Sequence, residues 1–366
     1  MMAKSSNELL VGVEEEFHLV ALDSGRLTPA AMALLELLPG DRYSAELQET
    51  AIEAHSAPWA ELGDLADDLT ATRRTLIGTA EEQGLGVVAS GTVPLGEVSG
   101  CVVPPVPRFQ RMHDLYRTLA GEQLICSVQV HVDVPGRDRD LAARVLQRLA
   151  PWLPVFLALS ASSPFWRSSD TGYASYRSLL WQRWPTAGPP GSFGGAAEYD
   201  ALVAELVAQG TILDPGMVYF DVRPSSHLST LELRVCDACP RVDDVVLLAG
   251  LFRALVRREC AAVEREFRPV RAELLRSAMW HAARSGLSGT LIDPAAGRPA
   301  PSGEVVRDLL TGLRPFLEDA GDWDLVSSLT ADLLERGDCA ARQRAVHARG
   351  GSLRAVVAGL ATETRG

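Results

Sequence analysis

The chain has no long, uncharged apolar stretch. The longest apolar helical run, at residues 245–256, contains Arg253 and is too short to cross a bilayer. A second run, at residues 9–20, is interrupted by three consecutive glutamates, which fits neither a signal peptide nor a membrane span. We therefore expect a cytoplasmic protein that does not act at a membrane.

Cysteine and positive charge are also scarce. The sequence has 6 cysteines in 366 residues and a formal net charge of -12. In a reducing compartment so few cysteines are expected to be free thiols. The negative charge disfavours nonspecific nucleic-acid binding, whose affinity comes largely from cationic contacts with phosphates. A nucleotide substrate is compatible with this negative net charge, because bound metal ions could supply positive charge. The cysteines are Cys101, Cys126, Cys236, Cys239, Cys260 and Cys339.

Several common catalytic patterns are missing. The sequence has neither a Gly-x-Ser-x-Gly elbow nor a His-Glu-x-x-His run. Cys236 and Cys239 have the spacing of a redox or zinc motif, but no second Cys/His pair accompanies them. The glycine-rich stretch at residues 191–195 is neither a P-loop nor a dinucleotide fingerprint, and we expect an ordinary loop there.

What is present suits a globular enzyme. Hydrophobic residues make up 47% and charged residues 22%, which is ample for a core. No Pro-, Gly- or Ser-rich linker divides the chain, so we expect a single catalytic domain over residues 1–366, mostly helical from about residue 243. The irregular segment 162–193 is rich in aromatics, which argues against disorder and for a functional role.

The order of predicted elements favours an α+β fold with an antiparallel sheet, because strands occur without the regular strand–helix alternation of a parallel sheet. Strand patterns lie at residues 9–20, 41–54, 85–90, 124–134, 217–223 and 230–236. Helical patterns lie at residues 60–83 and at 141–161, where Pro151 and Pro154 predict a kink.

Carboxylates placed inside strands are the most informative feature. Alternation puts Glu14 and Glu16 on one face of the first strand, with Glu15 on the opposite face, where we expect it to be solvated. Two adjacent carboxylates raise each other's pKa unless a positive charge lies between them. A hard divalent cation would provide that charge. For Glu14 and Glu16 alone, a solvated charge run explains the pattern equally well.

Three further sets repeat this pattern of polar groups on strands. Each alone has a structural explanation, such as a surface carboxylate, a hydrogen-bonded histidine or an ion pair. A sheet face that carries metal and anion ligands explains all of them together. The sets are Glu46 with Glu53, then Gln129, His131 and Asp133, and finally Glu232 with Arg234.

Such a face suits phosphoryl transfer. A triphosphate must be neutralised, and charge on the moving phosphoryl group must be stabilised by metal and arginine. Mg²⁺ commonly bridges a few carboxylates to phosphate oxygens. The candidate arginines are Arg177, Arg223 and Arg234, each of which could instead form a structural ion pair.

At these residues the chain resembles the type-2 bacterial glutamate–cysteine ligases, especially their carboxylate–amine ligase branch. The matching motifs extend from residue 12 to about residue 344. They are Gly12-Val-Glu-Glu-Glu-Phe17, Ala158-Leu-Ser-Ala-Ser-Ser-Pro-Phe-Trp166, Asp170-Thr-Gly-Tyr-Ala-Ser-Tyr-Arg177, Trp184-Pro-Thr-Ala-Gly-Pro-Pro190, Asp221-Val-Arg-Pro-Ser225, Thr230-Leu-Glu-Leu-Arg-Val-Cys-Asp237 and Ala340-Ala-Arg-Gln-Arg344.

The resemblance implies a glutamine-synthetase-like catalytic fold, in which an antiparallel sheet forms a funnel flanked by helices. It also implies an ATP- and Mg²⁺-dependent ligase that phosphorylates a carboxylate, typically of glutamate, and then joins it to an amine such as cysteine, as in glutathione-like thiol biosynthesis. Arg234 is implied beside the transferring phosphoryl group, with Arg177 and Arg223 facing substrate or phosphate. The implied metal ligands are Glu14, Glu16, Glu46, Glu53, Gln129, His131 and Glu232.

The sequence departs from the branch at two positions. The central strand usually reads His-Val-His-Val-Gly, and here it is Gln129-Val-His-Val-Asp133. The turn that usually reads Gly-Thr-His-Pro is here Gly91-Thr-Val-Pro94. We therefore predict that His131, rather than Gln129, carries any imidazole function of the central strand.

Two other functions stay open from the sequence. A phosphotransferase of the guanidino-kinase type would use the same sheet without an acceptor amine. A non-catalytic nucleotide- or metal-binding regulator is the other alternative, although the retained carboxylates and Arg234 argue against a decayed site. A homo-oligomer is compatible with the sequence, but no pattern in it indicates one.

Overall fold

A computed structural model describes residues 9–96 and 102–366 of the chain. Cys101 and residues 1–8 lie outside the described residues. The five described cysteines are all free, as predicted, and all five are buried. Within the described ranges, no helix combines the length and the apolar character needed to cross a membrane.

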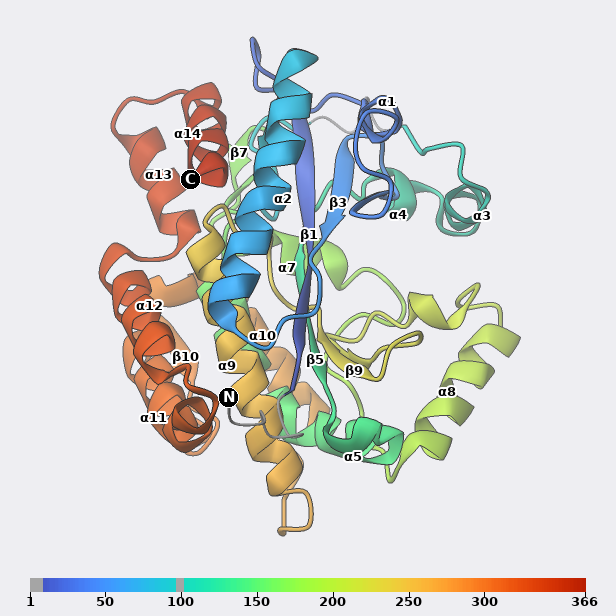
Figure 1. The fold of residues 1–366 in the computed structure, drawn as a ribbon, viewed down its shortest axis with the longest axis vertical. Coiled ribbons are helices and arrows are strands. Elements are labelled where there is room, and N and C mark those ends of the chain that lie inside the picture. The colour runs from blue at the N-terminus through green and yellow to red at the C-terminus, as the bar shows by residue number, and fades with distance from the viewer. Residues whose placement is uncertain (1–8, 97–101) are drawn as a thin grey trace, which may run out of the picture.

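The centre of the molecule is a seven-stranded antiparallel sheet (Figure 1). The strands follow the order β2-β3-β1-β5-β9-β8, and β4 pairs with the C-terminal half of β1. Their bounds are β1 Val11–Ala21, β2 Tyr43–Ala45, β3 Ala51–His55, β4 Leu85–Val88, β5 Val128–Asp133, β8 Val222–Pro224 and β9 Thr230–Leu233. The predicted α+β fold with an antiparallel sheet is confirmed.

Helices α2 (Leu62–Glu82) and α9 (Val242–Ala261) cover one face of this sheet (Figure 1). The helix predicted at residues 141–161 is α5 (Arg139–Leu149) and α6 (Leu153–Ser160), separated by a 3₁₀ turn at Ala150–Trp152. Pro151 and Pro154 cause this break, because proline removes a backbone donor and clashes with the preceding helical turn.

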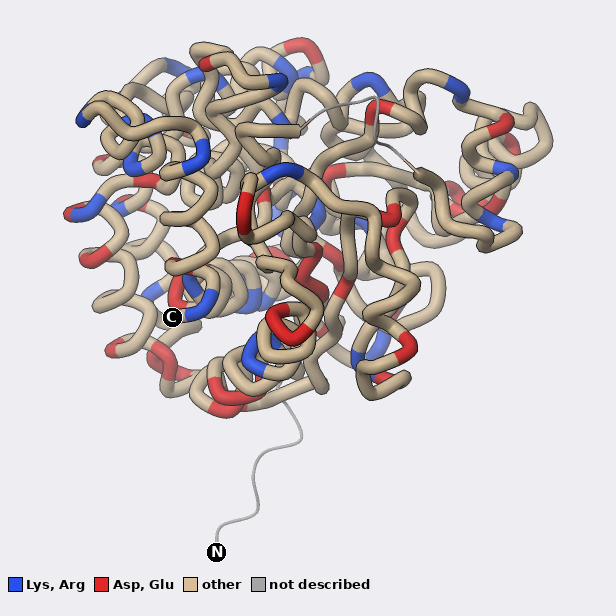
Figure 2. Tube along the Cα trace, turned by 90° about the horizontal axis from the view of Figure 1, so that it is seen from above, with Lys and Arg blue, Asp and Glu red and all other residues tan. Residues whose placement is uncertain are grey.

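The remaining helices surround this core. Helices α11 to α14 stack along one side of the molecule (Figure 1). Figure 2 shows both basic and acidic positions on the outer helices. The bounds are α1 Ala31–Leu35, α3 Pro107–Tyr116, α4 Thr118–Gly121, α7 Tyr176–Trp181, α8 Ala196–Ala208, α10 Ala272–Ser285, α11 Ser302–Ala320, α12 Trp323–Arg336, α13 Cys339–Ala348 and α14 Leu353–Arg365.

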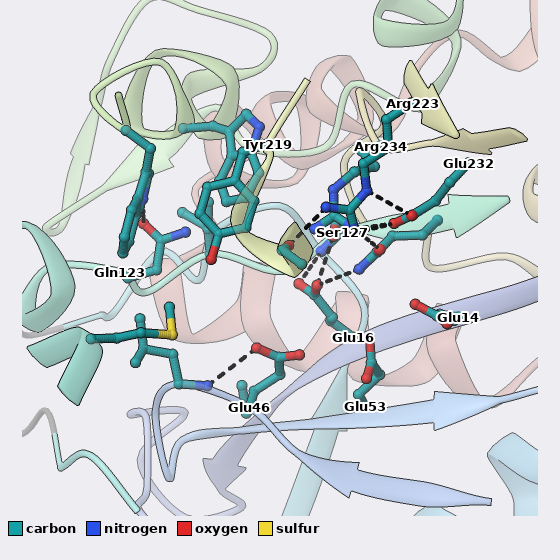
Figure 3. Close-up of a pocket in the computed structure, with 18 of the residues that line it drawn as sticks. Glu14, Glu16, Glu46, Glu53, Gln123, Ser127, Tyr219, Arg223, Glu232 and Arg234 are labelled. Carbon is teal, nitrogen blue, oxygen red and sulfur yellow. Dashed lines mark hydrogen bonds and ion pairs between the residues drawn. The ribbon is translucent and has the colours of Figure 1, made fainter. Parts of the chain in front are cut away.

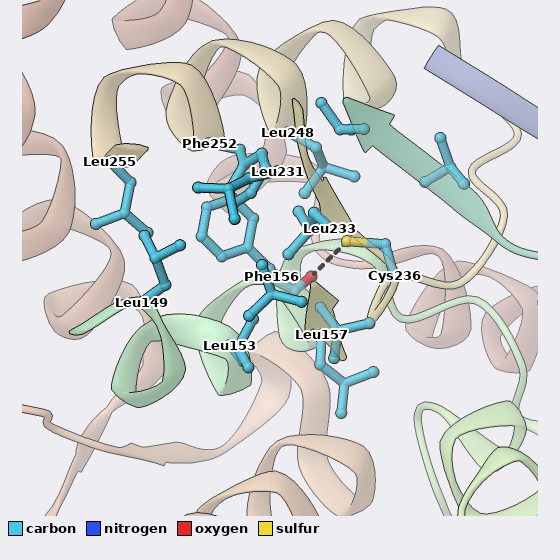
Figure 4. Packing of buried hydrophobic residues seen from close by; sticks show 14 of the residues in the cluster. Leu149, Leu153, Phe156, Leu157, Leu231, Leu233, Cys236, Leu248, Phe252 and Leu255 are labelled. Atoms are coloured by element: carbon cyan, nitrogen blue, oxygen red, sulfur yellow. Dashed lines mark hydrogen bonds between the residues drawn. The ribbon is translucent and has the colours of Figure 1, made fainter. Parts of the chain in front are cut away.

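The main core lies between the sheet, α9 and the α5–α6 pair (Figure 4). Phe156 of α6 and Phe252 of α9 meet edge to face, with ring centroids 5.9 Å apart. Leu231 and Leu233 point into the same cluster from β9, and both are fully buried. Because alternate residues of a strand face opposite sides, the residue between these leucines, Glu232, must point away from the core.

Two predicted strands differ from the structure. The strand predicted at residues 41–54 is two short strands, β2 and β3, with Glu46 in the loop between them. The strand predicted at residues 217–223 is regular only at its end, where β8 begins at Val222; a 3₁₀ turn at Pro215–Met217 and mostly irregular chain precede it. Arg223 donates hydrogen bonds to the carbonyls of Gly216 and Val218, at 2.7 and 2.6 Å, so a side chain satisfies groups that a strand would pair.

Two smaller hairpins complete the fold. Strands β6 (Phe165–Trp166) and β7 (Ser169–Asp170) form one hairpin, inside the segment predicted to be irregular. Strands β10 (Thr290–Ile292) and β11 (Pro299–Pro301) form the other, within the part of the chain predicted to be mostly helical. A 3₁₀ turn at Pro135–Arg137 follows β5, and another at Gly286–Ser288 follows α10.

Candidate active site

Strand register gathers the predicted ligands on the sheet face opposite α2 and α9. Directly paired residues of antiparallel strands point to the same face. Glu16 lies opposite Glu53, and Glu14 lies opposite both His55 and Gln129. Across the next pair of strands, His131 lies opposite Glu232. The register thus brings together side chains from positions 14 to 232.

These side chains line a cavity of about 550 Å³. In Figure 3 the carboxylates of Glu14, Glu16, Glu46 and Glu53 lie near one another, with Glu232 beside two arginines. All ten site residues that the family resemblance implies line this cavity. They are Glu14, Glu16, Glu46, Glu53, Gln129, His131, Arg177, Arg223, Glu232 and Arg234.

The described residues form three overlapping groups that could each hold a metal ion. Within each group the potential ligand atoms lie within 4.8 Å of one another. Glu14 belongs to two groups, and Glu53 also belongs to two. The groups are Glu14 with Glu53 and His55, Glu14 with His131 and Glu232, and Glu16 with Glu46 and Glu53.

The second of these groups contains a close carboxylate–imidazole contact. Nε2 of His131 lies 3.3 Å from Oε1 of Glu14. Burial lowers the pKa of His131, but Glu14 and Glu232 outweigh burial and leave the pKa raised. Burial likewise raises the pKa of Glu14, and the contact with His131 reverses this and leaves the pKa lowered. The imidazole of His131 and the carboxylate of Glu14 therefore each favour the charged form of the other.

The third group has no such positive neighbour within it. Burial and the charge of Glu16 raise the pKa of Glu46 to about 8. Burial, with the charges of Glu46, Glu14 and Glu16, raises the pKa of Glu53 well above its usual range. Carboxylates that resist ionisation in this way gain stability when a cation binds between them. The donor set is all oxygen, which suits Mg²⁺.

Glu16 is held in place by neighbouring donors. Its carboxylate accepts hydrogen bonds from the backbone N–H of Ser127 at 2.7 Å and from the hydroxyl of Ser127 at 2.8 Å. The side-chain amide of Gln129 donates a third bond at 3.0 Å. Ser127 was not predicted, although it lies two residues before Gln129 and so faces the same side.

On the other side of the cavity, Glu232 lies between two arginines. Arg223 contacts it with two nitrogens, at 2.8 and 3.2 Å, and Arg234 pairs with it as well. Burial raises the pKa of Glu232, but these arginines hold the pKa well below its usual range. Arg234 also donates to Gln129 Oε1, so the Gln129 amide bridges Arg234 and Glu16.

Arg177 lines the cavity but binds backbone. Its guanidinium donates to the carbonyls of Val235 and Arg234, at 3.2 and 3.3 Å. It also lies 3.8 Å from the fully buried carboxylate of Asp237. In this conformation Arg177 supports the chain that carries Arg234.

Two sequence-based expectations need correction, and one residue near the site was missed. Glu15, predicted to be solvated, is 3% exposed and paired with Arg73 of α2. Asp133 lies outside the cavity, and its carboxylate accepts a hydrogen bond from the backbone N–H of Leu10. His55 was missed, although alternation places it on the same face as Glu53, two residues earlier. Burial lowers the pKa of His55, which favours the neutral ring that binds metals.

Val93, which replaces a histidine of the resembling branch, packs in an apolar cluster with Val20, Val88 and Phe165. It is 1% exposed and is absent from the cavity lining. The other departure, Gln129, lies inside the site.

Comparison with known proteins identifies the family of the chain. The model of the glutamate–cysteine ligase family 2 matches residues 10–359. A putative glutamate–cysteine ligase 2-2 of Frankia casuarinae is 52% identical over 97% of this chain and 41% of its own length. A putative glutamate–cysteine ligase 2-2 of Mycolicibacterium smegmatis is 50% identical over 97% of this chain and 89% of its own length. The chain thus spans less than half the length of the Frankia relative.

Solved structures share the fold at low sequence identity. A bifunctional glutathione synthetase from Pasteurella multocida has a TM-score of 0.70 at 16% identity, over 98% of this chain and 52% of its own. A glutamate–cysteine ligase from Francisella tularensis, in complex with AMP, also has a TM-score of 0.70, at 12% identity, over 99% of this chain and 90% of its own. The predicted glutamine-synthetase-like fold is thereby supported, and the family match over nearly the whole chain shows that it belongs to glutamate–cysteine ligase family 2.

Proposed function

We propose that this chain is an ATP-dependent ligase that joins the carboxylate of an amino acid such as glutamate to an amine. The observation that carries the proposal is the cavity itself. It contains three groups of potential metal ligands, which overlap at Glu14 or Glu53 and lie beside Arg234. A cluster of carboxylates can approach a triphosphate only if cations neutralise both. The relatives named as glutamate–cysteine ligases support the same activity.

In this proposal the acidic side chains hold Mg²⁺. Mg²⁺ would neutralise the triphosphate and the surrounding carboxylates when bound. The raised pKa values of Glu46 and Glu53 support a cation site, because both carboxylates become easier to ionise beside a positive charge. Glu14, Glu16 and Glu232 complete the oxygen ligands, and His131 and His55 offer nitrogen.

Arg234 is proposed to stabilise the phosphoryl group during its transfer. Its guanidinium is anchored by Glu232 and Gln129 at the cavity wall, which fixes its orientation before substrates bind. Arg223 is proposed to act mainly by holding Glu232, since most of its donors are already used. Arg177 is proposed to keep the Arg234 segment in place.

The reaction is proposed to proceed through an acyl phosphate. A carboxylate oxygen attacks the γ-phosphorus of ATP and ADP leaves, and the amine nitrogen then attacks the acyl carbon and displaces phosphate. The amine loses a proton as the amide forms. We place the whole reaction in one catalytic domain formed by this chain.

The test is product analysis with oxygen-18 in the substrate carboxylate. Release of ADP and phosphate should require both glutamate and an amine, and the phosphate should carry the label. Label retained wholly in the amide, or release of AMP and pyrophosphate, would contradict the acyl-phosphate route. ADP release without any amine, with a phosphorylated product, would indicate a phosphotransferase instead.

A further inference from the structure

One end of the cavity is built from aromatic rings. Trp181, Trp184 and Tyr219 all line it, and each is at most 8% exposed. The rings of Trp181 and Tyr219 have centroids 4.7 Å apart, and those of Trp184 and Tyr219 are 5.5 Å apart. Phe109, Met112 and Ile125 add apolar surface beside them. We call these six residues the aromatic wall.

Few polar atoms interrupt this wall, and one of them is the buried indole Nε1 of Trp181, which has no hydrogen-bond partner among the described residues. The indole N–H of Trp184 is already used, in a 2.8 Å hydrogen bond to the side-chain oxygen of Gln123. Burial raises the pKa of Tyr219 to about 12, so its hydroxyl stays protonated and uncharged. The cation at this end, Arg108, is paired with Asp214 at 2.9 Å. A ligand at the wall therefore meets mostly ring and aliphatic surface.

The aromatic wall begins directly beside the arginine proposed to face the phosphoryl group. The guanidinium carbon of Arg234 lies 5.8 Å from the ring centroid of Trp181 and 5.8 Å from that of Tyr219. In Figure 3, Tyr219 and Gln123 stand on one side of the cavity, and Arg234, Glu232 and Glu16 on the other. A group that touches the wall is thus about one side chain away from the reacting atoms.

This short separation distinguishes the adenine of ATP from the side chain of the attacking amine. Adenine is separated from the γ-phosphoryl group of ATP by a ribose and two further phosphates, a span longer than the 5.8 Å between Arg234 and the rings of Trp181 and Tyr219. The side chain of the attacking amine has the required length. A cysteine side chain has only one carbon and a thiol, and it would leave most of the wall uncovered.

We propose that the aromatic wall selects an amine substrate with a bulky apolar side chain, preferably an aromatic one. This inference rests on the proposed ligase function and specifies its acceptor. Complete burial of an aromatic side chain corresponds to about 10- to 100-fold in affinity over a small one. Edge-to-face contacts with Trp181 and Tyr219 would add specificity for flat rings.

The experiment compares kcat/KM for phosphate release with glutamate fixed and phenylalanine, leucine, cysteine or alanine as the amine. We expect phenylalanine to exceed alanine and cysteine by about 10-fold or more. Phe109→Ala should reduce the ratio of phenylalanine to alanine. Leu115→Ala is the matched control, because Leu115 lies on the same helix, is 42% exposed and is absent from the cavity lining; it should preserve the ratio.

Three results would overturn the proposal: alanine or cysteine equal to phenylalanine, a Phe109→Ala variant that keeps the ratio, or one that raises only the KM for ATP. The last would place adenine at the wall. If no amine supports turnover, the ligase proposal fails, and calorimetry still tests the wall. Phenylalaninamide binding at least about 10-fold more tightly than alaninamide would support aromatic selection, and equal binding would overturn it.

Discussion

Glu15 and Glu16 are neighbours on β1, yet they lie in opposite environments. Glu15 points toward α2, where Arg73 contacts both of its oxygens at 3.1 and 2.5 Å. Glu16 points into the cavity, where it shares a potential metal group with Glu46 and Glu53. One carboxylate is neutralised by the protein itself, and the other lies among further carboxylates.

The comparison shows that a charge run in a strand can serve two purposes at once. Arg73 also donates to the carbonyl oxygens of Cys239 and Pro240, so Glu15 helps to join β1, α2 and the chain after β9. The side of β1 that carries Glu16 faces two further carboxylates, Glu46 and Glu53, and a cation would relieve the repulsion among them. Stability and ligand binding should therefore respond to different glutamates.

The largest expected effect is on stability, from Glu15→Gln. Removing one charge of a buried ion pair leaves Arg73 without its counter-ion, and we expect a loss of about 3 kcal/mol in the free energy of unfolding. Urea unfolding of the metal-free protein measures this loss. Glu82→Gln, on an exposed position of the same helix as Arg73, is the control and should change stability little. Intact stability with impaired turnover would reverse the assignment of the two faces.

The next effect is on turnover, from Glu16→Gln. We expect kcat for ADP release to fall by about 10²- to 10³-fold, on the scale of losing one electrostatic contact in a transition state. The free energy of unfolding should change little, because lost hydrogen bonds from Ser127 are offset by relief of carboxylate repulsion. Near-normal turnover at low Mg²⁺ concentration would show that Glu16 is not a ligand.

A third prediction concerns pH. The pKa of Glu46 is raised from its usual 4.5 to about 8, so between these values the folded metal-free protein keeps a proton that the unfolded chain releases. Stability should therefore fall as pH rises through this window, by ~1 kcal/mol or more. Melting temperatures from pH 4.5 to 8 in a chelator measure the fall. Mg²⁺ and, separately, Glu46→Gln should each reduce it, and a flat profile in the unchanged protein would contradict the prediction.

The smallest expected effects come from His131→Ala and His55→Ala. The Mg²⁺ concentration for half-maximal turnover should rise by about 10-fold, the usual range for residues that support metal ligands. His55→Ala should act in the same direction but less strongly, because its Nδ1 lies 3.9 Å from Glu14, against 3.3 Å for His131. A lower melting temperature with an unshifted Mg²⁺ titration would assign His131 a structural role alone.

Particular residues show how far sequence patterns reach. Alternation in residues 9–20 and 124–134 correctly placed Glu14, Glu16, Gln129 and His131 on inward faces, because the period of a strand depends only on local geometry. The same rule correctly set Glu15 apart but could not reveal Arg73, which lies 58 positions away. It also missed His55, since a histidine two residues after Glu53 is informative only when that strand is known to border β1.

By itself, the sequence determined the α+β class, the carboxylates that the sheet carries and the membership of a ligase family. These depend on periodicity and on motifs along the chain. The tertiary structure decided which charges are compensated and which are not. Strand register brought Glu14, Glu53, His131 and Glu232 into one cavity, and helix packing placed Arg73 behind Glu15. Such choices depend on contacts between distant segments, which no local pattern encodes.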